Sequence, residues 1–127
     1  ASPKLVQELG TPKTPKELSN WPLICYSNAT NPSLWTFKGD GEKTGSVNLR
    51  PSLYANSASM MKEACLEGVG AAQLPQFCCD SNIMDGSLMH ILPEYSTAPA
   101  RGVYVIYPDK KFMPLKVRKF IDILETR

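Results

Sequence analysis

LYANSASMMKEACLEGVGAAQLP, residues 53–75, is the stretch that decides the fold class of this 127-residue chain. Residues 53–55 are apolar or aromatic, as in a short strand, and Asn56-Ser57 supplies side chains that favour the start of a helix. The helix is expected to run to about Glu67, because the glycine that follows is a common helix end. The small and apolar residues 69–75 then predict a second strand. The stretch therefore predicts a strand, a helix and a strand in succession.

The sequence before this stretch predicts two short helices and three strands. Residues 2–10 and 14–18 each begin with a capping residue followed by proline, which favours a helix start. Residues 23–26, LICY, form an apolar run between a proline and a polar segment, which is typical of a buried strand. Residues 35–38 and 44–49 alternate apolar and polar side chains on either side of a glycine-containing turn, and this pattern predicts a hairpin.

The sequence after the stretch predicts two more strands and a final helix. A short turn-rich segment leads to a strand over residues 88–92, and residues 103–107, VYVIY, form a continuous apolar strand of the kind buried on both faces. The last helix is expected to begin at Pro114 and to carry an apolar stripe, formed by Val117, Phe120, Ile121 and Leu124. Because strands and helices alternate along most of the chain, we expect an α/β layer fold with a mainly parallel or mixed sheet.

Composition and charge describe an ordinary globular domain. The apolar share is 43%, the charged share is 20%, and 14 basic against 12 acidic residues leave a net charge of +2. These values exclude a disordered tail, and the scattered basic residues lack the footprint of a nucleic-acid surface. The longest apolar run is far shorter than the roughly 20 residues of a membrane-spanning helix, so we expect a soluble protein that binds no membrane. Four cysteines in a domain of this size fit reduced thiols in a cytoplasm.

An ordered set of short motifs runs along nearly the whole chain. Its residues are Ala1-Ser2-Pro3, Leu5, Gly10, Pro12, Pro15, Leu18, Trp35, Phe37, Asn56-Ser57, Gly68-Val69-Gly70-Ala71, Leu74-Pro75, Gly86-Ser87-Leu88, Ile91-Leu92-Pro93, residues 104–108, Pro114, residues 117–121 and Leu124. Each motif alone is weak, and their order is more specific. As an ordered set, these motifs resemble the C-terminal half of LysR-type transcriptional regulators.

The resemblance implies a type 2 periplasmic-binding-protein-like lobe, with three layers and a mixed sheet, together with part of its partner lobe. Residues 1–95 would form the second lobe of an effector-binding domain. Residues 96–127 would form the return strand and the C-terminal helix, which belong to the first lobe. About half of the first lobe and the DNA-binding head would lie outside this chain, so we expect the apolar stripe of the last helix to lack part of its cover.

The resemblance also implies an effector site in the cleft between the two lobes. Helix N-termini offer unbonded amides and a partial positive charge to an anion. The candidates for holding a carboxylate or a similar anion are therefore Asn56, Ser57, Ala58 and Ser59, although N-capping alone would explain the same residues. Further candidates for the cleft wall are Val69, Gly70, Pro75, Phe77 and Tyr104. For the two aromatic residues, a place in the core is an alternative interpretation.

The sequence offers little for catalysis or for metal binding. His90 is the only histidine, and no nucleophile motif points to it as a base, so we expect a structural role. No cysteine or histidine pair has zinc-ligand spacing. A redox-sensing thiol at Cys65 or at Cys78-Cys79 is an alternative, but no lysine, arginine or histidine flanks these cysteines closely enough to lower a thiol pKa. We expect no enzyme activity, no cofactor and no metal.

The leading hypothesis is the ligand-sensing part of a cytoplasmic bacterial regulator, in which a small-molecule effector resets the geometry of distant DNA-binding heads. The whole protein would be a dimer or a tetramer and would contact DNA only through a domain absent from this chain. Two alternatives stay open. One is a lobe of a periplasmic solute-binding protein, and the other is a small enzyme that uses a cysteine and His90.

Overall fold

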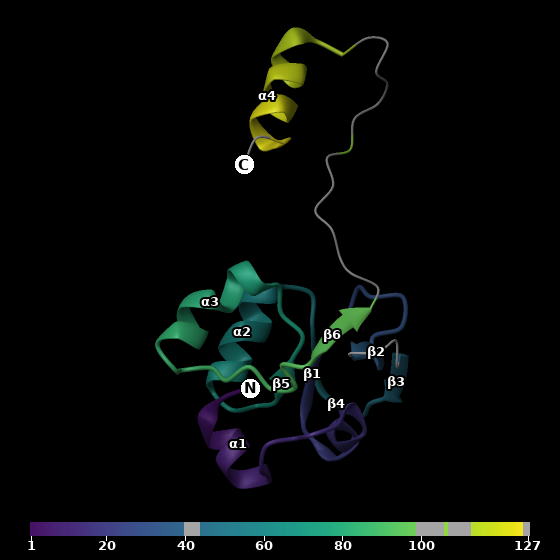
Figure 1. Cartoon of the computed structure of the whole chain (residues 1–127), viewed down its shortest axis with the longest axis vertical. Coiled ribbons are helices and arrows are strands. Elements are labelled where there is room, and N and C mark those ends of the chain that lie inside the picture. Colours follow the sequence, from purple (N-terminus) through teal and green to yellow (C-terminus); the bar gives the residue numbers. More distant parts are fainter. Residues whose placement is uncertain (40–43, 99–105, 107–112, 126–127) are drawn as a thin grey trace.

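A computed structural model of the chain describes residues 1–39, 44–98, 106 and 113–125. Strands and helices alternate along the chain, as the sequence predicts (Figure 1). In chain order the elements are α1 (Pro3–Leu9), the 3-10 helix η1 (Pro15–Asn20), β1 (Leu23–Tyr26), β2 (Leu34–Gly39), β3 (Thr44–Asn48), β4 (Pro51–Ala55), α2 (Ala58–Leu66), β5 (Ala71–Ala72), α3 (Gln76–Met84), β6 (Tyr95–Ala98) and α4 (Leu115–Glu125).

The strands form one parallel sheet and one antiparallel sheet. The parallel sheet has the order β4-β1-β5, and α2 connects its two outer strands. The antiparallel sheet has the order β3-β2-β6 and contains the predicted hairpin, with Trp35 opposite Val47. The mixture of parallel and antiparallel strands is therefore confirmed, and it is divided between two sheets.

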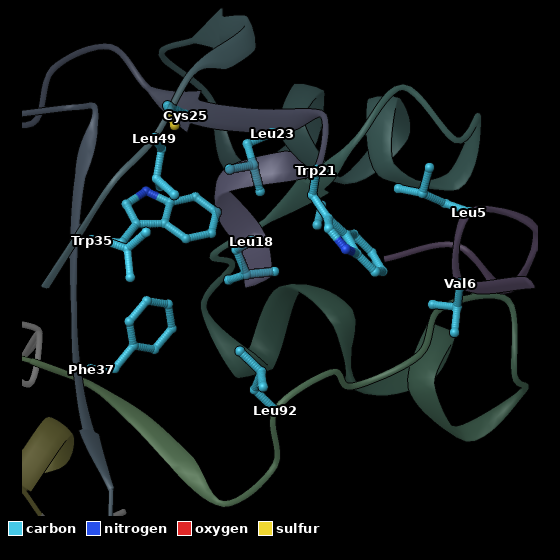
Figure 2. Close-up of a cluster of buried hydrophobic side chains, with 12 residues drawn as sticks. Leu5, Val6, Leu18, Trp21, Leu23, Cys25, Trp35, Phe37, Leu49 and Leu92 are labelled. Atoms are coloured by element: carbon cyan, nitrogen blue, oxygen red, sulfur yellow. The ribbon is translucent and has the colours of Figure 1, made fainter. Parts of the chain in front are cut away.

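The central strand β1 separates two hydrophobic clusters. Leu23, Ile24 and Cys25 are all 0% exposed. Leu23 and Cys25 belong to a cluster that includes Trp35 and also residues of α1, η1 and β3 (Figure 2). Ile24 points to the other side, because successive side chains of a strand alternate between faces, and it packs in a second cluster with Met61 of α2. The apolar run of β1 is thus buried on both faces, as the sequence predicts for residues 23–26.

Helix α4 lies apart from the rest of the described structure (Figure 1). It begins directly after Pro114, as expected. Phe120 and Leu124 of the predicted apolar stripe are exposed, and Phe120 is 58% exposed. None of the helices in the described residues is long and apolar enough to cross a membrane.

The prediction of a strand over residues 88–92 is wrong. This segment is a loop whose side chains Leu88 and Leu92 are buried in the two clusters. Leu92 has a φ of 54°, which no strand residue adopts, and its carbonyl accepts a hydrogen bond from the Tyr95 amide at 3.0 Å. The chain therefore turns here, and the strand β6 begins at Tyr95.

Two other predictions need correction. The segment after Pro75, expected to be rich in turns, forms the nine-residue helix α3 instead. No residue of this helix is fully buried. A helix without a buried face does not need the regular apolar period by which sequence analysis detects helices. The strand predicted for residues 69–75 is only two residues long, at β5. The strand predicted over residues 103–107 lies outside the described residues, except for Ile106, which is not part of a strand.

Truncation of the central strand should destabilise the fold far more than the same truncation at the surface. Leu23→Ala removes a fully buried side chain between two packed elements and should lower the free energy of unfolding by about 2–5 kcal/mol. Leu9→Ala is the matched control, since Leu9 is 46% exposed, and it should cost less than about 1 kcal/mol. Urea unfolding of both variants measures the difference, and equal losses would contradict the two-sided burial of β1.

Candidate functional site

The carboxyl ends of the three parallel strands meet at one edge of the sheet. Tyr26 at the end of β1 lies beside Ala55 at the end of β4, and the Ser27 amide donates to the Ala55 carbonyl at 2.9 Å. Strand β5 runs in the same direction on the other side of β1. In open α/β sheets, ligands bind outside this edge. A site is therefore expected among the segments that follow β1, β4 and β5.

The predicted anion-binding residues open helix α2 at this edge. Asn56, Ser57 and Ser59 are exposed and Ala58 is half-buried. Ser57 is the N-cap residue, yet its side chain makes no capping hydrogen bond. Among the described residues, no protein acceptor bonds the amides of Ala58, Ser59 and Met60. These amides therefore remain available to an anion.

The predicted wall residues Val69 and Gly70 precede β5, at the opposite end of this strand from the α2 opening. Val69 is exposed. A Cβ atom at Gly70 would lie 2.7 Å from the Pro22 carbonyl oxygen, and the neighbouring Ala71 amide donates to the same oxygen at 2.9 Å. The missing side chain of Gly70 thus lets β5 approach β1, which accounts for the glycine without a ligand.

A large open hollow of about 690 Å³ lies beside β5 and α3. Its lining includes Pro75 and Phe77, two of the predicted residues, and also Trp35, Gln73 and Tyr95. Phe77 is 75% exposed, so its ring covers a surface and is not part of the core. The residues of the α2 opening, and Val69 and Gly70, do not line this hollow. Tyr104 lies outside the described residues.

Sequence analysis missed Gln73, which the structure places between two cavities. Gln73 follows β5 and lines both the large hollow and a small cavity of about 20 Å³. Its side-chain nitrogen Nε2 is buried and has no hydrogen-bond partner. A glutamine within the small and apolar residues 69–75 was a signal that could have identified it.

The cysteines and the histidine do not form an activated site in the described residues. Burial raises the pKa of the Cys25 and Cys65 thiols, and it is also the main cause of the raised pKa of Cys79. These thiols are therefore held in the protonated form, which is a poor nucleophile. His90 is exposed. No group of three or more metal-ligating side chains gathers within the part of the chain that the structure describes.

Comparison with known proteins identifies the family. The model of the LysR substrate binding domain matches residues 1–127. The chain belongs to this family. The match covers the α2 opening, the hollow and α4 alike.

Several relatives of this LysR domain are named as transcriptional regulators. The regulator PtxR of Pseudomonas aeruginosa is 32% identical over 124 residues, which cover 98% of the chain and 39% of PtxR. The regulatory domain of AphB from Vibrio vulnificus is 31% identical with a TM-score of 0.77, over 99% of the chain and 61% of that domain. Full-length AphB of Vibrio cholerae, described as a virulence activator, is 25% identical with a TM-score of 0.77, over 98% of the chain and 42% of AphB.

These matches confirm the predicted fold class, an α/β lobe like that of LysR regulatory domains. The LysR domain described here spans about two fifths of the length of PtxR and about three fifths of the AphB regulatory domain. The names of the relatives favour a sensing domain of a regulator over a lobe of a solute-binding protein and over a small enzyme.

A side chain at Gly70 should disturb the fold, because this glycine serves the sheet. Gly70→Ala places Cβ against the Pro22 backbone and should cost about 1–3 kcal/mol of stability through overpacking. Gly45→Ala in β3 is the matched control, since nothing lies within 4 Å of its added Cβ, and it should be neutral or slightly stabilising. Thermal unfolding of the two variants compares them. If Gly70→Ala unfolds like the wild type, the close approach of β5 to β1 is not required.

Proposed function

We propose that this LysR domain is the effector-sensing part of a DNA-binding transcriptional regulator. The family match over the whole chain and the names of the relatives support this function. In the whole protein, a small molecule would bind beside this lobe and shift the relative arrangement of lobes and subunits. That protein would be a cytoplasmic dimer or tetramer, and it would contact DNA through a separate domain.

The observation that carries this proposal is the open hollow beside β5 and α3. Its volume of about 690 Å³ lies within the range of roughly 300–1,000 Å³ typical of small-molecule sites. Pro75 and Phe77 supply apolar surface to it, and Gln73 supplies a hydrogen-bond donor. The AphB regulatory domain extends well beyond the part that this chain covers. In the whole protein, such additional chain would close the open side of the hollow.

The effector is proposed to carry a carboxylate or a similar anion, which the opening of α2 would hold. The unbonded amides and the lack of a side-chain cap at Ser57 support this proposal. The residues involved are Asn56, Ser57, Ala58 and Ser59, which lie at the same sheet edge as Gln73. Tyr104, Val69 and Gly70 stay predictions for the wall of the cleft. The proposal requires no metal or cofactor.

Binding of a carboxylate at the α2 opening can be tested by removing one amide. Ala58→Pro deletes the N–H group of the first helical residue, a position where proline is well tolerated. Ser57 has a φ of −131° and a ψ of 128°, the extended conformation that a residue before proline prefers. Stability should therefore change little. The affinity for small carboxylates that raise the melting temperature of the wild-type chain should fall by about 3- to 10-fold, as for one lost hydrogen bond.

Ala58→Gly is the control, because it keeps the amide and removes only a methyl group. Its carboxylate affinity should stay close to that of the wild type. If Ala58→Pro binds the same carboxylates as tightly as Ala58→Gly does, the amides of α2 do not hold the anion. If no member of a broad carboxylate screen stabilises the wild-type chain, the anionic effector itself is contradicted.

A further inference from the structure

Gln73 lines the hollow, and its buried side-chain nitrogen has no hydrogen-bond partner within the fold. Two buried side-chain polar atoms lack a partner among the described residues, Gln73 Nε2 and Asn82 Oδ1. Asn82 still uses its amide nitrogen, which donates to Ser87 Oγ at 3.0 Å, and it lines neither cavity. The nitrogen of Gln73 has no such bond, although Gln73 lines both cavities.

An unpaired buried donor lowers the stability of a fold, because the group has lost its water without gaining a protein partner. An apolar side chain of the same length would avoid this loss. The neighbours of Gln73 along the chain, Ala72 and Leu74, are half-buried and pack against the second hydrophobic cluster. The packing here therefore does not require a polar side chain, and an acceptor outside the protein is the natural partner for Nε2.

The two cavities differ in what they can hold. The small cavity measures about 20 Å³, which is room for about one water molecule. The large hollow measures about 690 Å³ and has the size of a ligand site. Trp35 and Gln73 line both, so the glutamine amide stands in the wall that the cavities share.

The charges around the hollow indicate what kind of acceptor would suit Gln73. The lining includes Asp80, His90 and Ala1, whose terminal amine donates to the Met89 carbonyl at 3.1 Å, and no lysine or arginine is among the described residues that form it. The aromatic and aliphatic lining, which includes Phe37, Phe77 and Ile91, favours an apolar body. At the wall formed by Gln73, the donor available to an oxygen is therefore a neutral amide, which supplies a hydrogen bond and no ion pair.

We propose that Gln73 is the specificity-determining donor of the hollow, and that it binds a carbonyl or carboxylate oxygen on an otherwise apolar guest. This inference rests on the proposed function, in which the hollow holds the effector. It adds the chemical class of the guest, a molecule with an apolar body and an sp² oxygen that reaches the wall between the two cavities.

Three probes of similar shape test the proposal on the 127-residue chain. Acetophenone carries a neutral carbonyl, benzoate carries a carboxylate, and ethylbenzene has the same ring with no oxygen. The readout is the pair of Gln73 side-chain amide signals in a ¹⁵N NMR spectrum, assigned by their loss in Gln73→Met. We expect acetophenone or benzoate to shift these signals. We expect ethylbenzene to shift the backbone signals of Phe77 and Ile91 while the Gln73 side-chain signals stay in place.

Affinity provides the second measurement. Gln73→Met should weaken the binding of the oxygen-bearing probe about 3- to 10-fold and leave ethylbenzene unaffected. Gln7→Met is the matched control, because Gln7 is exposed and lines neither cavity. It should leave the affinities for the oxygen-bearing probes and ethylbenzene unchanged.

The outcomes separate this inference from the proposed function. If the probes shift signals of the hollow but not those of Gln73, the hollow binds guests and Gln73 does not select them. If no probe shifts any signal of the hollow, both proposals fail. If Gln73→Met is markedly less stable than Gln7→Met, a water in the small cavity already satisfies Nε2, and the donor role is overturned.

Discussion

The burial of β1 on both faces is the constraint on which the rest of the structure depends. Leu23 and Cys25 pack toward the antiparallel sheet, and Ile24 packs toward α2. A short strand with no exposed face has to be covered by separate elements on each side. The remaining elements serve this need: α2 covers one side, and the β2-β3 hairpin, η1 and α1 cover the other.

The same constraint places the candidate site. Because β4 and β5 must both run parallel to β1, the opening of α2 and the residue Gln73 arrive at the same edge of the sheet. Gly70 allows β5 to approach β1 closely enough to do so. Trp35 packs in the first cluster and also lines the hollow. The site is therefore built from the edges of the two hydrophobic clusters, and its polar groups are those that the clusters leave unpaired.

Sequence analysis predicted the elements that have a clear apolar run, capping pair or alternating pattern of their own. The LICY run predicted β1, the Asn56-Ser57 pair predicted the start of α2, and the alternating residues around the turn predicted the hairpin. Helix α3 escaped prediction because it buries no residue fully. The mostly apolar residues 88–92 were misassigned because buried leucines can anchor a loop as well as a strand. For the site, sequence identified Pro75 and Phe77, whereas the unpaired state of Gln73 depends on neighbours distant in the chain, such as Trp35, and no local pattern contains them.

Native-state hydrogen exchange of the chain tests the role of β1 most directly. Amides in the fully buried β1 should exchange only through global unfolding, whereas amides of α3, whose side chains are all at least partly exposed, should exchange through local opening. The account predicts that Ile24 and Cys25 are among the slowest amides and that their exchange follows the global stability in denaturant. Exchange of β1 as fast as that of α3 would show that the strand does not hold the two clusters together.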